Sequence, residues 1–160
     1  MPDSIGGLPL HPLVVHAVVV LVPLVALGVI AVAVVPRWST TYGNLLLIVT
    51  VVGTASIPVA EHTGEQLRAT LPATAAISHH ASLGSAMKWL GMPLLLAGVA
   101  MWWMGRRRKQ ERPLGRGVEV ALRVVCVVIA LANLAWVVRV GHSGAETLWQ
   151  GVGQQQSSSG

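Results

Sequence analysis

Charged residues are scarce in this sequence. Lys, Arg, Asp and Glu make up 11% of its 160 residues, whereas a soluble domain carries about 25% because its surface must be hydrated. Phe is absent, and Tyr occurs once beside six Trp. These shortages argue against a water-soluble globular domain, since too few charged side chains are present to cover its surface.

Cysteine and recognisable catalytic motifs are also lacking. The single Cys126 lies in an apolar stretch, so no disulfide can form within the chain and cysteine gives no information about the redox compartment. We find no catalytic triad, no nucleotide-binding loop and no CxxC pattern in the sequence. Whether the chain is an enzyme is therefore left open.

What the sequence has in abundance is long apolar runs. Hydrophobic residues make up 53% of the chain, and the mean hydropathy is +0.65. Four stretches come near the length of about 20 residues that a bilayer demands; they run from Leu10 to Val35, Asn44 to Ala60, Leu83 to Met104 and Val118 to Val140. Each should be a helix, because backbone groups in hydrocarbon must bond within their own segment.

These runs predict an all-α integral membrane protein, a bundle of four transmembrane helices in one domain over residues 1–152. Residues 153–160 are polar and of low complexity, and we expect them to be disordered. Gly28, Gly53, Gly84, Gly91 and Gly98 lie on the spans. Such small residues suit helix packing in membranes, or a slot for a haem.

The distribution of basic residues predicts the orientation. The third connection, Gly105 to Gly117, contains Arg106, Arg107, Arg108, Lys109, Arg112 and Arg116, whereas the amino-terminal tail has no Lys or Arg. By the positive-inside rule, the first and third connections face the cytoplasm of a bacterium. Both termini and the connection of residues 61–82 then lie outside the inner membrane. Despite a pI near 10.7, we exclude nucleic acid as a partner, because the basic residues lie in one short loop.

Two helical hairpins show an internal likeness. Val22-Pro23-Leu24 to Val29 matches Met92-Pro93-Leu94 to Val99, and Glu61-His62-Thr63-Gly64 matches the run His142-Ser143-Gly144. A His also precedes the span in each half. We interpret this as a duplicated two-helix unit, whose copies would be related by an axis along the membrane normal.

All six histidines fall on the predicted outer side, and none lies in a cytoplasmic connection. They are His11, His16, His62, His79, His80 and His142, and three acids, Glu61, Glu65 and Glu146, lie on the same side. His16 is the most notable, because it lies about one turn below the outer surface, where a polar group is costly without a partner. We expect His80 rather than His79 to face the bundle, since Leu83 and Met87 have compatible spacing.

The predicted site is an outer cavity to which the ends of all four helices contribute a His. Imidazole is the commonest metal ligand in proteins and suits Zn, Cu and Fe, and two histidines from facing helices can also hold a haem iron. We expect His16 and His80 as cofactor ligands, with His62 and His142 as second choices. The wider candidate metal set is His11, His16, His62, His80, His142 and Glu65. Interfacial histidines without a cofactor, or a proton relay, are the alternatives.

Three further polar features have simpler interpretations. Glu119 and Arg123 have the spacing of an ion pair one helical turn apart. Asn133 lies in mid-span, where a hydrogen bond between helices is its expected role. Lys88 and Arg139 lie near the outer ends of spans and should extend toward water or pair with Glu65, Glu146 or a haem propionate.

The opening Gly7-Leu8-Pro9-Leu10-His11-Pro12-Leu13-Val14-Val15-His16 resembles that of a bacterial four-helix membrane family, domain of unknown function 2231. His80-Ala81-Ser82-Leu83-Gly84 and the Gly141 to Trp149 end are similar to its actinobacterial branch, and the resemblance covers about residues 5–152. The family has no settled activity, but its distant similarity to membrane b-type cytochromes implies haem. This chain has Ala17-Val18-Val19 where typical members have a Phe-Pro-Ile run, which puts functions of the broader family in doubt here.

The leading hypothesis is a redox-associated membrane protein that binds haem b, or a Zn, Cu or Fe ion, on its outer side for electron transfer. The alternative is a cofactor-free accessory or structural subunit of a larger membrane or respiratory complex, or a homodimer. A transporter or channel fits less well, because few polar residues lie near the bilayer midplane.

Overall fold

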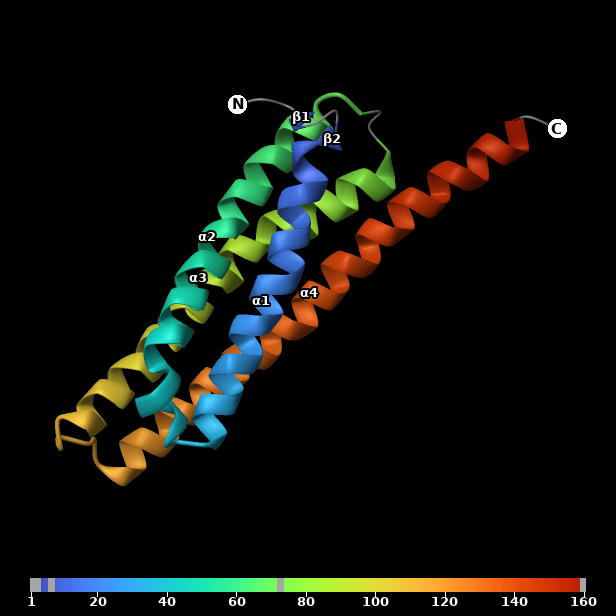
Figure 1. Cartoon of the computed structure of the whole chain (residues 1–160). Coiled ribbons are helices and arrows are strands. Elements are labelled where there is room, and N and C mark those ends of the chain that lie inside the picture. Colours follow the sequence, from blue (N-terminus) through green and yellow to red (C-terminus); the bar gives the residue numbers. More distant parts are fainter. Residues whose placement is uncertain (1–3, 6–7, 72–73, 159–160) are drawn as a thin grey trace.

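The chain forms four long helices. The computed structural model describes residues 4–5, 8–71 and 74–158, with side chains described over 10–71 and 74–146. The helices are α1 (Leu10–Val34), α2 (Trp38–Arg68), α3 (Ala75–Lys109) and α4 (Arg116–Ser158) (Figure 1). Two-residue strands β1 (Ser4–Ile5) and β2 (Leu8–Pro9) pair antiparallel before α1. All four helices are long and apolar enough to span a membrane.

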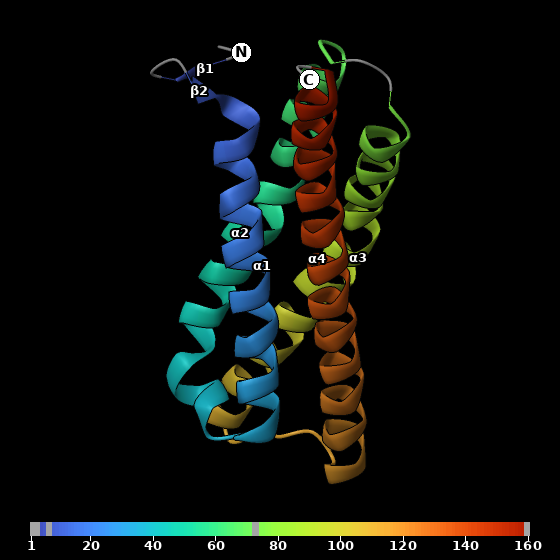
Figure 2. The same ribbon diagram turned by 90° about the vertical axis from the view of Figure 1, so that its right-hand side faces the viewer.

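The helices form an up-down-up-down bundle. α1 packs against α2 and α4, α3 packs against the same two helices, and α1 and α3 face each other on the diagonal. The start of α1 and the end of α4 lie at the same end of the bundle (Figure 2), together with the connection between α2 and α3. This end is termed the outer end, after the predicted orientation, and the opposite end is the inner end.

Three helices extend beyond the apolar stretches that predicted them. α2 begins at Trp38 rather than Asn44, and α3 begins at Ala75 rather than Leu83. α4 continues to Ser158, through residues for which the sequence predicts a disordered tail. Hydropathy marks only the part of a helix that suits hydrocarbon. Backbone hydrogen bonding continues past it wherever no breaker intervenes, and glutamine is a good helix former.

The core is apolar and lies in the middle of the bundle. On α1, Val22, Val25, Ala26 and Val29 are fully buried. The core continues on the other helices at Leu46, Ile57, Leu94, Ala97, Met101, Cys126 and Ala130. Many large apolar side chains face outward instead, which is the arrangement expected where lipid replaces water around a bundle.

Glycines bring α3 close to α2. A Cβ on Gly91 would lie 2.6 Å from Ile57 Cδ1, and one on Gly98 would collide with the Thr50 side chain. Gly105 likewise lies against the backbone of Ser39. Small residues at such crossings allow helix backbones to approach closely in membranes. The packing interpretation of these glycines therefore holds on this face, whereas Gly84 has no neighbour within 4 Å of its Cβ position.

The two hairpins share burial at some of the matched residues and not at others. α2 is buried at Gly53, Ile57 and Thr63, and α4 is buried with the same spacing at Asn133, Val137 and Ser143. The matched proline-containing strings behave differently, because Val22 is fully buried whereas its counterpart Met92 is 60% exposed. Those strings therefore occupy different helix faces, and the likeness lies at the outer ends.

Candidate functional site

His11 is held at the outer end by the last turns of α2. It is the second residue of α1, and its Nδ1 lies 3.2 Å from Thr63 Oγ1. The ring lies over Gly64, where a Cβ would come within 2.9 Å of His11 Cε1. A hydroxyl and a bare backbone at adjacent positions of α2 thus fix the imidazole, which is half-buried.

His80 makes the same contact within the second hairpin. Its Nδ1 lies 2.9 Å from Ser143 Oγ on α4. A Cβ on Gly144 would come within 3.1 Å of His80 Cε1, so this ring also lies against a glycine. The His-hydroxyl-glycine arrangement is therefore present once in each hairpin.

The hydroxyls determine which ring nitrogen carries hydrogen. Thr63 Oγ1 donates to the carbonyl of Val59 at 3.0 Å or Ala60 at 3.1 Å, and Ser143 Oγ donates to the Val140 carbonyl at 2.9 Å. A hydroxyl has one hydrogen to donate, so with that hydrogen on the backbone carbonyl each oxygen accepts from the facing Nδ1–H. With the hydroxyl hydrogens placed in this way, the network assigns the Nδ1–H tautomer to both rings, in which Nε2 carries the lone pair.

The two imidazoles lie close enough to interact electrostatically, although they belong to separate hairpins. They reach this position from α1 and α3, the diagonal pair. Within the part of the chain that the structure describes, no group of three or more His, Cys, Asp or Glu side chains could hold a metal ion. The predicted gathering of one histidine from each helix is therefore not found among the described residues.

The other candidate residues point away from this pair. His16 is exposed, and its Nδ1 lies 2.6 Å from the Pro12 carbonyl one turn earlier in α1. His62 is exposed beside Gln66, with 3.4 Å between their side-chain nitrogens. His142 is exposed and lies 3.2 Å from Glu146. Two further candidates, His79 and Glu65, are also exposed.

These positions change the choice of residues. Sequence reasoning preferred His16 because of its depth along the helix, but depth does not give the direction in which a side chain points. His11 was named only in the wider candidate metal set, and it is the half-buried residue that lies against Thr63 and Gly64. The roles of Thr63 and Ser143 were missed, although the paired His-Thr-Gly and His-Ser-Gly strings carried the signal.

An ion pair lies near the site. Lys88 Nζ lies 2.7 Å from Glu61 Oε1 and joins α3 to α2. Lys88 was expected to extend toward water or to pair with Glu65 or Glu146. Arg139 stacks over Trp136, with its guanidinium carbon 5.5 Å from the ring centre.

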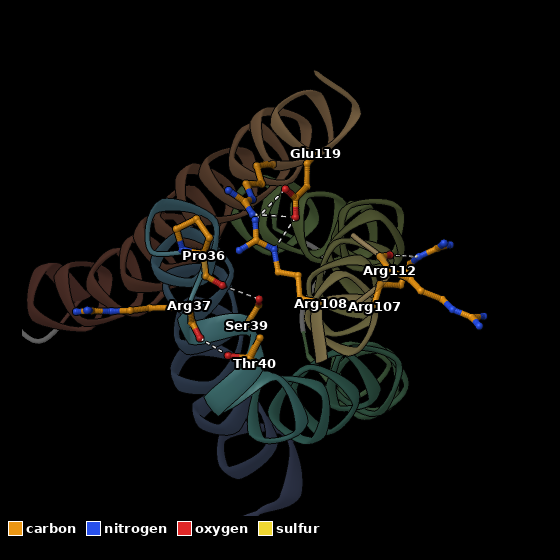
Figure 3. A network of polar contacts seen from close by, with 9 residues as sticks. Pro36, Arg37, Ser39, Thr40, Arg107, Arg108, Arg112 and Glu119 are labelled. Atoms are coloured by element: carbon orange, nitrogen blue, oxygen red, sulfur yellow. Dashed lines mark hydrogen bonds and ion pairs between the residues drawn. The ribbon is translucent and has the colours of Figure 1, made fainter. Parts of the chain in front are cut away.

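A second polar cluster lies at the inner end. Arg108 on α3 donates two hydrogen bonds, of 2.7 and 2.8 Å, to the carboxylate of Glu119 on α4, and Figure 3 shows the two side chains facing each other. Arg123 adds a contact of 3.2 Å, which confirms the predicted Glu119–Arg123 pair. The bidentate contact of Arg108 with Glu119 was not predicted, because the two residues lie on separate helices.

Asn133 acts as predicted. Its Nδ2 donates to the Leu90 carbonyl at 3.2 Å and so joins α4 to α3. Its Oδ1 is buried without a hydrogen-bond partner, as is Thr50 Oγ1 on α2. Both atoms lie in the apolar middle of the bundle, away from the histidine pair.

Comparison with known proteins gives one match. The family described as "Predicted membrane protein (DUF2231)" matches residues 7–156, nearly the whole chain. No curated protein and no solved structure matches the sequence.

Proposed function

The chain belongs to the DUF2231 family of predicted membrane proteins, and we propose that it carries a redox cofactor between His11 and His80. The observation behind this proposal is the tautomer of the two rings. A ligating histidine almost always donates its other ring N–H to a neighbouring group, which orients the ring and raises its basicity. Thr63 and Ser143 are placed to accept such bonds, and in the Nδ1–H tautomer the Nε2 atom of each ring is the one that would bind a metal.

The donor set favours haem b over a bare metal ion. A structural zinc site needs four protein ligands and a catalytic one needs three, whereas no group of three or more such side chains is found among the described residues. A haem iron needs fewer ligands from the protein, and His11 and His80 would hold it. Gly64 and Gly144 leave room for both rings. When bound, a haem would supply one-electron chemistry.

The proposed position is the outer side of the bacterial inner membrane, with both termini outside the cytoplasm. Four apolar helices and an inner end rich in Arg support this placement. Electron transfer at such a position would involve a partner on the outer side or a larger membrane complex.

The test is an absorbance spectrum of the purified protein, expressed with adequate haem, with and without dithionite. We expect haem bands in the native chain and their loss in His11→Ala and in His80→Ala. His16→Ala is the matched control, because it removes an exposed histidine from the same helix as His11, and it should keep the bands. A colourless preparation without bound metal would contradict the proposal. Loss of the haem bands in His16→Ala to the same extent as in His11→Ala and His80→Ala would also contradict it.

The second candidate is a cofactor-free accessory subunit. It is favoured by one observation, namely that each imidazole already has a partner in its own hairpin and could simply fasten the outer ends of the helices. In that case, a stoichiometric partner should co-purify. His11→Ala and His80→Ala should then lower stability while the function of the complex persists.

A further inference from the structure

The inner end carries basic side chains that no acid neutralises. Glu119, a buried acid in this region, is occupied by Arg108 and Arg123. Arg106 and Lys109, in the last turn of α3, have no ion-pair partner among the residues that the structure describes. These two are among the basic side chains of the inner end that form no ion pair in the described part of the chain and can meet an external anion.

Trp102 arranges donors beside these cations. Its Nε1–H donates to Asn44 Oδ1 at 2.9 Å, which leaves the amide NH₂ of Asn44 available. The guanidinium of Arg106 stacks over the same indole, 5.2 Å from its ring centre. Gly43 lies directly against Trp102, since a Cβ there would be 3.7 Å from Trp102 Cα. One indole thus positions an amide donor from α2 and a guanidinium from α3.

These donors line a cavity that is open to the surface. It has a volume of about 280 Å³ and is lined by Asn44, Arg106, Lys109 and Gln110, with no acidic residue among them. The negative end of the α3 dipole lies here, but four consecutive basic residues in its last turn outweigh that partial charge. Guanidinium, ammonium and amide donors together suit the oxygens of a phosphate.

We propose that this cavity binds the phosphate of an anionic phospholipid at the inner membrane surface. Neighbouring side chains favour a lipid over free phosphate. Leu45 and Ile48, next to Asn44 on α2, are 59% and 61% exposed and would contact acyl chains. The exposed Trp103 and Trp38 suit the headgroup level, where amphipathic rings gather.

Native mass spectrometry of the detergent-purified chain tests this proposal, with phosphatidylglycerol and phosphatidylcholine as probes. We expect a preference for phosphatidylglycerol. Arg106→Gln with Lys109→Gln should reduce its binding at least about tenfold, because charged hydrogen bonds are lost. Arg112→Gln with Arg116→Gln is the control, since it removes the same charge from the same end outside the cavity.

A variant that leaves the net charge unchanged distinguishes binding at this cavity from non-specific electrostatic attraction of the lipid to the basic inner end. Asn44→Leu should also weaken phosphatidylglycerol binding, with the fold checked by circular dichroism and elution volume. Equal effects of the two double variants, or unchanged binding by Asn44→Leu, would overturn the proposal. Displacement of the lipid by millimolar inorganic phosphate would overturn the choice of lipid and indicate a free phosphate site. The outcome is independent of whether the outer end binds haem.

Discussion

Two hydroxyls determine the chemical character of the histidine pair. Thr63 and Ser143 each have a backbone carbonyl within hydrogen-bond distance. When they donate to it, they face the imidazole as acceptors, and this arrangement assigns the Nδ1–H tautomer. The carbonyls of α2 and α4 thus favour one state of rings that belong to α1 and α3.

Nitrogen-15 histidine spectra should report this tautomer directly. We expect His11 and His80 in the Nδ1–H form in the native chain. Thr63→Val keeps the side-chain shape and removes the acceptor, so His11 should lose this preference. His80 should keep it, because its acceptor lies in the other hairpin. Loss of preference at both rings, or at neither, would contradict the assignment.

The glycines beneath the rings should be equally sensitive. Gly64→Ala and Gly144→Ala place a methyl group within about 3 Å of an imidazole carbon, and overpacking of this kind costs about 1–3 kcal/mol. Gly141→Ala is the control, because its Cβ position has nothing within 4 Å. Unfolding by titration with sodium dodecyl sulfate should show a lower free energy of unfolding for Gly64→Ala and Gly144→Ala than for the native chain. A comparable decrease for Gly141→Ala would show that the effect comes from replacing any glycine of these helices and not from contact with the imidazoles.

At the scale of elements, the closest contact lies between α2 and α3. Thr50 is fully buried, and its Oγ1 has no hydrogen-bond partner in the described part of the chain. It lies against Gly98, where the absence of a side chain lets the two helices approach. A Thr-Gly contact of this kind fixes the distance and the register of two antiparallel helices.

Gly98→Ala should therefore destabilise the bundle by about 1–3 kcal/mol, measured by the same unfolding titration. Combining it with Thr50→Ala should recover part of this loss, since the colliding side chain is then shortened. Gly84→Ala on the same helix meets nothing within 4 Å and should have little effect. If the decreases in the free energy of unfolding simply add in the double variant, Thr50 and Gly98 do not contact each other.

The Arg108–Glu119 contact joins α3 to α4 at the inner end (Figure 3). The Glu119 side chain is 10% exposed and that of Arg108 is 29% exposed, so water screens the pair only partly. Glu119→Gln should cost about 2 kcal/mol, because hydrogen bonds to charged groups are among the stronger ones and two cations lose their counter-charge. The exposed Glu111→Gln in the adjacent connection is the control. Equal unfolding curves for both variants would show that the contact contributes nothing to stability.

At the scale of the whole molecule, chemistry is divided between the two ends. The outer end holds the histidines, the Lys88–Glu61 pair and the hydroxyls of Thr63 and Ser143, whereas the inner end holds the cluster around Glu119 and most of the basic residues. The middle is apolar apart from a few residues such as Thr50 and Asn133. Polar side chains thus concentrate at the two ends of the bundle, as expected where the middle lies in hydrocarbon.

Cysteine labelling tests this placement. The native Cys126 is buried, so it should remain unlabelled and need not be replaced. With a membrane-impermeant maleimide on intact bacterial spheroplasts, Thr70→Cys in the outer connection should react and Gln110→Cys at the inner end should not. The reverse pattern would place the histidine pair in the cytoplasm. Labelling of both after lysis is the control for accessibility.

The sequence alone predicted the four helices, the inner cluster of basic residues and the confinement of the histidines to one end. These features depend on composition and order along the chain, because a span forms wherever enough apolar residues follow one another. The tertiary structure decided which histidines meet. The direction of a side chain depends on the rotation of its helix against its neighbours, so His16 is exposed while His11 lies against Gly64 and Thr63. The partners of Arg108 and Gly98 lie on other helices as well, and only packing brings them together.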